Sequence, residues 1–240
     1  MIDWLKRADI DPMIDLGGTL VPIVLRRHAT AKRLTLRLAP DGNEVRITLP
    51  QWARSREAIA FAYARRDWLT EQFAKVPIRV PPKSGDEVDY RGQKVRIIWD
   101  ETARRKPLLE GGVLRMGGLQ EGLDKRIQRW LEKQARTLCE TDMTEFTKIA
   151  KLAPVPVGLS RAQRRWGSCS DKQRIRINWR LIQAPDFVRR SVVAHEVAHL
   201  VHFDHSPAFH ALLDTIYDDD ITRADQWLKE NGRGLYASFG

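Results

Sequence analysis

The sequence predicts an α+β protein, in which strands and helices occupy separate stretches of the chain. Short segments such as KRLTLRL and RIRINW alternate polar and apolar side chains, a period typical of half-buried strands. Two longer segments, residues 54–75 and 123–150, repeat their apolar side chains at helical spacing. Regular strand–helix alternation and a glycine-rich phosphate loop are both missing, which argues against Rossmann and P-loop folds.

The first elements are expected between residues 21 and 49, where strand signals dominate. Lys32–Leu38 and Glu44–Leu49 flank a Pro-Asp-Gly-Asn sequence, which is typical of a hairpin turn. From Arg54 to Lys75 the period changes to that of a single helix, and a proline follows its end.

Strand signals return at Glu87–Tyr90 and Lys94–Trp99. Two glycine pairs then follow, at 111–112 and 117–118, and such pairs are turn or linker signals. We therefore predict a basic, strand-rich N-terminal region with one helix over residues 1–118, and a second region over residues 119–240.

The second region begins with the long helical pattern, Leu123–Ala150. Three short strand patterns follow, and then three helices, the first beginning near residue 184. The predicted strands are Val157–Leu159, Arg164–Ser168 and Arg174–Trp179, and the last two predicted helices are Pro207–Ile216 and Ile221–Asn231. The sequence shows no internal repeat.

The composition limits the class of protein. The 240 residues carry a formal charge of +10, an excess that favours encounters with anions such as nucleotides or nucleic acid. No apolar run has the roughly 20 residues of a membrane helix, and the N-terminus lacks a secretory signal pattern. Two cysteines are too few for a disulfide framework. We expect a reduced, cytoplasmic protein with no membrane partner.

Five of the six histidines lie between residues 195 and 210, in HEVAHLVHFDHSPAFH. His195 and His199 are one helical turn apart and project from the same face of a helix. Glu196 lies beside the first of them, where its carboxylate can reach a metal-bound water. This HExxH spacing is typical of zinc hydrolases, in which Zn²⁺ has three protein ligands and one open position.

The third ligand must come from His202, His205 or His210. On a continuing helix His202 would lie about 10.5 Å along the axis from His195, too far to share one ion. His205 fits if the helix ends near Asp204 and the next helix begins at Ser206-Pro207. His210, on that next helix, is the weaker alternative. The spacing equals that of metzincins, but His202 replaces their glycine and no methionine follows residue 143.

Four segments of the sequence resemble motifs of a known family. RRWGSCS, INWRLIQAP, VVAHEVAHL and HSPAF closely resemble motifs of the YgjP-like metallopeptidases, and the resemblance is strongest over residues 160–212. It implies a compact zincin-like core related to SprT-type and Spartan-type proteases. By that pattern the zinc ligands are His195, His199 and His205, and Glu196 is catalytic.

Three functions are therefore considered. The first is a zinc metallopeptidase, in which Glu196 takes a proton from water and returns it to the leaving group of an extended peptide or protein substrate. The second is a divalent-metal nucleotide phosphohydrolase of the pyrophosphatase type, and the third a nucleic-acid-associated protease. Candidate oxyanion stabilisers are Arg164, Arg165, His202 and Tyr217.

Overall fold

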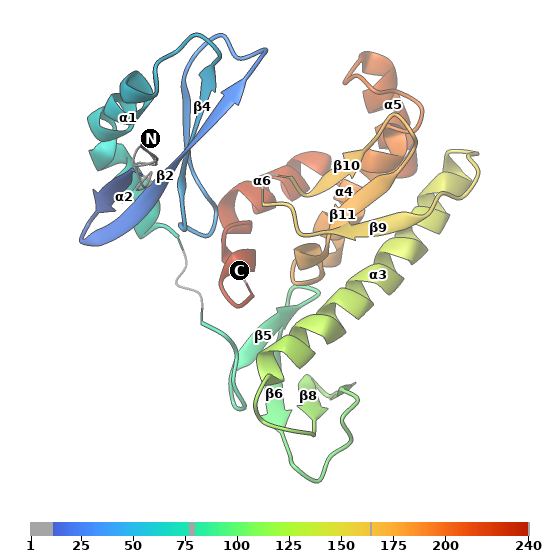
Figure 1. Cartoon of the computed structure of the whole chain (residues 1–240). Coiled ribbons are helices and arrows are strands. Elements are labelled where there is room, and N and C mark those ends of the chain that lie inside the picture. The colour runs from blue at the N-terminus through green and yellow to red at the C-terminus, as the bar shows by residue number, and fades with distance from the viewer. Residues whose placement is uncertain (1–11, 77–79, 164, 240) are drawn as a thin grey trace, which may run out of the picture. The chain divides into compact units, whose positions relative to one another are not determined.

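The computed structural model describes residues 12–76, 80–163 and 165–239 of the chain. The chain divides into two compact units, Met1–Ile78 and Arg79–Gly240. Figure 1 labels the helices and strands of both units.

The first unit contains a four-stranded sheet. Its inner pair, β2 and β4, is parallel, whereas β1 pairs with β2 and β3 pairs with β4 in antiparallel fashion. The predicted hairpin is confirmed as β3 and β4, but the strands begin earlier than residue 21. The strand order is β1-β2-β4-β3, with bounds β1 Met13–Leu16, β2 Thr19–His28, β3 Thr35–Leu38 and β4 Val45–Pro50.

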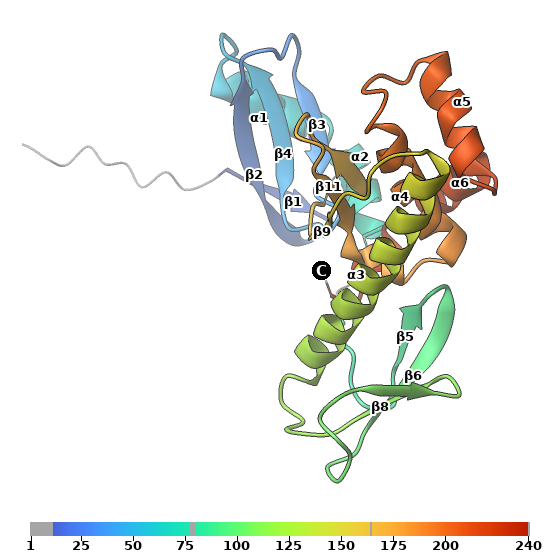
Figure 2. The same cartoon turned by 90° about the vertical axis from the view of Figure 1, so that its right-hand side faces the viewer.

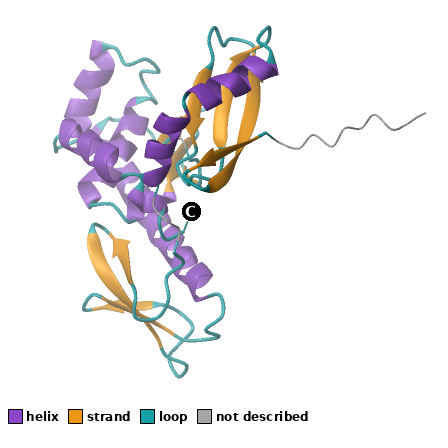
Figure 3. Cartoon of the chain, turned by 90° about the vertical axis from the view of Figure 1, so that its left-hand side faces the viewer, coloured by secondary structure: helices purple, strands orange, loops and turns teal. Residues whose placement is uncertain are grey.

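Two helices cover one face of this sheet (Figure 3). The single helix predicted from 54 to 75 is wrong, because α1 (Ser55–Ala64) and α2 (Arg66–Ala74) are separated at Arg65. At Arg65 the backbone leaves the helical region and its N–H bonds to the carbonyl three residues earlier. The break lets both helices contribute to one core, which the helical period of the sequence could not show. That core includes Ile14, Ile23, Ile47, Ala58, Ala62 and Leu69.

The second unit opens with another four-stranded sheet. The predicted strands Glu87–Tyr90 and Lys94–Trp99 are found as the hairpin of β5 (Glu87–Tyr90) and β6 (Gln93–Trp99), the second of which begins one residue earlier than predicted. Gly111 and Gly112 form the tight turn between two further strands, β7 (Leu108–Glu110) and β8 (Val113–Met116). The order β5-β6-β8-β7, with its parallel inner pair, repeats that of the first sheet.

The long helix α3 (Leu123–Ile149) packs against this sheet with its N-terminal half. Leu123, Ile127 and Leu131 share a core with Val95, Ile97 and Leu114 of the sheet. Its C-terminal half reaches the helices that follow, as Figures 1 and 2 both show. Residue 118, the expected boundary between the two regions, lies within the second unit. That residues 119–240 form the catalytic core stays a prediction.

A three-stranded sheet follows, in the order β10-β11-β9. The strands are β9 (Val157–Ser160), β10 (Gly167–Cys169) and β11 (Ile175–Asn178), and a 3₁₀ turn, η1, continues over Trp179–Ile182. β10 starts later than predicted, and Arg164, where that strand was expected to begin, lies outside the described residues.

Three helices and a short 3₁₀ turn complete the unit. They are α4 (Asp186–Ala198), α5 (Pro207–Ile216), α6 (Ile221–Asn231) and η2 (Gly234–Tyr236), so both predicted short helices are confirmed. α4 lies at the centre, with Val188, Val193 and Val197 fully buried among β11, α3 and α5. The α+β fold class is confirmed. No helix in the described part of the chain is long and apolar enough to cross a membrane.

Candidate metal centre

The centre of the site is the C-terminal end of α4. The helix ends at Ala198, with His199 as its C-cap, and His202 N–H bonds the Ala198 carbonyl as the chain turns away. We expected the helix to end near Asp204, and this is wrong by more than one turn. The Asp204 carboxylate instead accepts a hydrogen bond from Ser206, which lowers its pKa.

Three imidazole side chains converge at the C-terminal end of α4. The Nε2 atom of His195 lies 3.1 Å from that of His199 and 3.3 Å from that of His205. Nitrogens about 2.0–2.1 Å from a tetrahedral zinc ion are about 3.3 Å from one another, so the spacing suits a shared ion. His202 and His210 are not part of this group within the described residues.

The protonation of two of these rings also suits a cation. Nδ1 of His199 lies 2.9 Å from the carbonyl oxygen of His202, so this nitrogen carries the proton and leaves the Nε2 lone pair free. Burial, helped by the neighbouring histidines, lowers the pKa of His195 to about 4. His195 is therefore neutral at pH 7, as a metal ligand must be.

Phe209 fixes the relative positions of the three rings. It is fully buried, and its ring centroid lies 4.6 to 5.0 Å from the centroids of His195, His199 and His205. The Ser206 side chain accepts a hydrogen bond from the Phe209 backbone N–H and so caps α5, with Pro207 at the first turn. This local sequence turns the chain back, so that His205 faces the end of α4.

Glu196 lies against β10, the strand formed by the RRWGSCS segment. Its side chain is buried, and its Oε2 atom has no hydrogen-bond partner within the described residues. Burial raises the pKa of Glu196 to about 7, against the opposing effects of Arg165 and of a hydrogen bond from the Cys169 backbone N–H. A buried carboxylate oxygen without a protein partner is costly unless another group approaches it.

Gly167 makes room for this carboxylate. A Cβ atom at residue 167 would lie 2.3 Å from Oε1 of Glu196 and 2.7 Å from its Cγ. Gly167 and Phe209 lie within the RRWGSCS and HSPAF motifs, but no individual role was predicted for either. A glycine inside a strand is a signal of close approach, so Gly167 was detectable in principle. Phe209 gave no such signal, because an apolar residue on a helix is ordinary core.

The remaining candidates are differently placed. Tyr217 donates its hydroxyl proton to the Phe187 carbonyl at 2.8 Å, which commits it to packing. Two further side chains of this region are Trp179, which is buried against Phe239, and Cys169, a half-buried free thiol near Glu196. Arg164 lies outside the described residues. Arg165 is exposed and close enough to Glu196 to affect its pKa.

Comparison with known proteins identifies a family. The family model described as YgjP-like, metallopeptidase domain matches residues 32–231, a range that covers parts of both units and contains all three imidazoles. No curated protein and no solved structure matches the chain. A model that spans most of the chain identifies its family. This chain therefore belongs to the YgjP-like metallopeptidase family.

Proposed function

We propose that this protein is a zinc-dependent metallopeptidase. His195, His199 and His205 would hold the ion, and Glu196 would be the general base. The observation that carries the proposal is the convergence of three imidazole Nε2 atoms, together with the buried carboxylate of Glu196, which follows His195 in the chain. His205 is exposed, so the centre is open to solvent and substrate on that side.

The reaction divides between the ion and the protein. Zinc, when bound, makes a water molecule acidic near neutral pH and polarises a carbonyl group. Glu196 would accept the water proton at Oε2, the oxygen that has no hydrogen-bond partner among the described residues. It would then transfer this proton to the leaving amine. Phe209 would hold the imidazoles in place during both steps.

The substrate is expected to bind in an extended conformation along β10. This strand pairs with β11 on one side only, and it lies against Glu196 through Gly167. A peptide that adds to the edge of a sheet is held by main-chain hydrogen bonds. Such a peptide would place one of its carbonyl groups near Glu196.

The test combines a metal assay with a substrate screen. Zinc-loaded wild-type protein is expected to contain about one ion per chain and to cleave unfolded protein or peptides. Glu196→Gln should bind the same amount of zinc but lose about 10³-fold in rate. Glu140→Gln, at an exposed position on α3, serves as the matched control and should retain full activity. Equal cleavage by wild type and Glu196→Gln would contradict the proposal.

The same preparation distinguishes a nucleotide substrate. Arg165 interacts with Glu196 electrostatically, and a guanidinium binds phosphate with two parallel hydrogen bonds. Release of phosphate or pyrophosphate from nucleoside triphosphates, lost in Glu196→Gln and unaccompanied by peptide cleavage, would replace the peptidase with a phosphohydrolase.

A further inference from the structure

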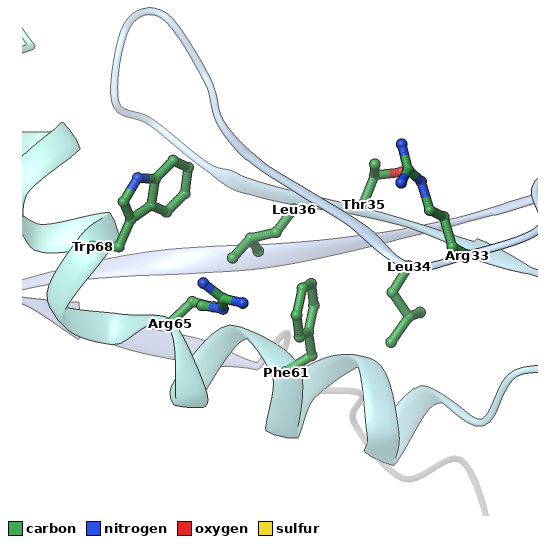
Figure 4. A pocket seen from close by; sticks show the side chains of 7 residues that line it. All are labelled: Arg33, Leu34, Thr35, Leu36, Phe61, Arg65 and Trp68. Atoms are coloured by element: carbon green, nitrogen blue, oxygen red, sulfur yellow. The ribbon is translucent and has the colours of Figure 1, made fainter.

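A cavity in the first unit lies outside the metal centre. Its volume is about 280 Å³, and it opens between strand β3 and the helices α1 and α2 (Figure 4). We call it the β3 groove. It is lined by Arg33, Leu34, Thr35, Leu36, Phe61, Arg65 and Trp68. All of these residues belong to the first unit, so the groove does not depend on how the two units are arranged.

The lining combines an apolar floor with a basic rim. Leu34, Leu36 and Phe61 are half-buried, and the Trp68 side chain is 43% exposed. Arg33 and Arg65 are exposed, and neither forms an ion pair with any residue in the described ranges. The groove therefore suits a ligand that presents an apolar side chain next to negative charge.

Strand β3 adds a third property. It is the last strand in the order β1-β2-β4-β3, and it pairs with β4 alone. Alternate backbone N–H and C=O groups on its other edge point away from the sheet, as on any edge strand. An exposed edge beside an apolar pocket is the arrangement by which proteins add an extended peptide to a sheet.

We propose that the β3 groove binds an extended, acidic segment of another polypeptide. The main chain of this segment adds to β3, one apolar side chain enters the cavity between Phe61 and Trp68, and flanking carboxylates pair with Arg33 and Arg65. Residues 12–76 contain eleven Lys and Arg against six Asp and Glu, which favours an acidic partner. The binding does not require that the metal centre hydrolyse the same segment.

The observations favour a polypeptide over a nucleic acid. Phe61 and Trp68 offer planar surfaces on which a base could stack, but Leu34 and Leu36, which belong to the strand side of the groove, are aliphatic and offer none. A nucleic-acid strand also has no alternating N–H and C=O groups to pair with β3. The positive charge of the unit suits both ligands, so an oligonucleotide belongs among the probes.

Binding is measured with full-length Glu196→Gln protein, so that no probe is cleaved. The probes are short fluorescent peptides with a central leucine flanked either by glutamates or by lysines. We expect the glutamate peptide to bind more tightly and to lose affinity with added salt. The double variant Arg33→Glu, Arg65→Glu should bind the glutamate peptide about tenfold more weakly or worse, and Trp68→Ser should weaken this binding as well.

Matched controls separate the groove from general charge. Arg56→Glu and Trp52→Ser change exposed residues of the same unit that do not line the cavity, and they should leave the affinity unchanged. N-methylation of alternate peptide nitrogens tests strand addition. Only one of the two alternating sets faces β3, so only that set should abolish binding.

Three results would overturn the proposal. They are equal binding of the lysine peptide, equal weakening by the control variants, and tighter binding of a single-stranded oligonucleotide that the groove variants abolish. Failure of the wild-type protein to cleave peptides would refute the proposed function and leave this binding result intact.

Discussion

The two ends of helix α4 bury polar side chains in opposite ways. Near its N-terminus Arg189 is almost fully buried, and its guanidinium meets the Asp142 carboxylate at 2.7 Å and also pairs with Asp186. At its C-terminus Glu196 is equally buried, but its Oε2 atom has no partner in the described part of the chain.

The first arrangement is satisfied within the protein itself. Asp142 accepts from both Arg189 and Arg190, and Asp186 accepts from Arg91 and Arg189. Such a network joins α3, α4 and the β5–β6 turn, and it leaves no buried charge without a partner. Its role is structural.

The second arrangement is not satisfied by the residues that the structure describes. The Nε2 atoms of three imidazoles lie close together, and one oxygen of the buried carboxylate of Glu196, which follows His195 in the chain, accepts no hydrogen bond within the described residues. The fully paired charges therefore lie near one end of α4, and an unpaired carboxylate oxygen lies near the other end, where the three imidazoles converge.

The largest effect is expected at the satisfied end. Asp142→Ala leaves Arg189 buried with fewer partners and should lower the free energy of unfolding by about 3–5 kcal/mol. Asp218→Ala removes a partner of Arg190 whose side chain is 82% exposed, and it should cost less than about 1 kcal/mol. Urea unfolding measures both values. A loss below 1 kcal/mol for Asp142→Ala would show that the pair is not a structural anchor.

Metal removal tests the unsatisfied end. A ligand that binds only the folded state stabilises it by about 4 kcal/mol at a thousand times its Kd, so chelation should lower the melting temperature. His195→Ala should abolish the difference between melting curves recorded with and without zinc. Asp142→Ala should preserve that difference while shifting both curves down. Unchanged melting of wild type after chelation would contradict the assignment of the ligands.

Gly167→Ala should impair catalysis and spare metal binding. Its Cβ would overlap Oε1 of Glu196 at 2.3 Å, so the carboxylate must move. A displacement of about 1 Å at a catalytic group costs about 100-fold in kcat/KM. Gly158→Ala, in β9 of the same sheet, meets its nearest atom at 3.5 Å and is the matched control. Zinc content and peptide cleavage should be measured on both variants, and full activity of Gly167→Ala would be the adverse result.

The smallest expected effect is the loss of folding stability at acid pH. Burial alone would raise the pKa of Asp186, but hydrogen bonds from Arg91 and Arg189 outweigh it and lower the pKa. The ion pairs therefore stabilise the protein above the unfolded pKa of about 3.9, and this contribution is lost as the pH falls through the folded pKa.

Asp186→Asn removes this contribution. Because Asp186 is partly exposed, the free energy of unfolding of the wild type should exceed that of the variant by only about 1 kcal/mol at neutral pH. The difference should shrink as the pH falls below about 4, measured by urea unfolding across a pH series. A difference that stays constant down to acid pH would show that Asp186 acts through packing and not through its charge.

The sequence predicts the start of α5 but not the end of α4. The Ser206-Pro207 sequence predicts the start of α5, because a cap and a proline act within one turn. The end of α4 at Ala198 was not predictable, because the residues that follow, Leu200 to Phe203, have no helix-breaking composition. The two four-stranded sheets share one strand order, yet their sequences show no repeat, since many apolar sequences satisfy the same topology.

The sequence by itself determined which residues are candidates for the metal site. The spacing of His195, Glu196 and His199 requires only a helix, and the period of side chains along a helix is local geometry. Tertiary structure alone decided what surrounds them: that His205 returns to the end of α4, that Phe209 lies under the three rings, and that Gly167 leaves space for a carboxylate. These contacts join separate elements of the chain, and their energies come from packing, which depends on the whole fold and on no single segment.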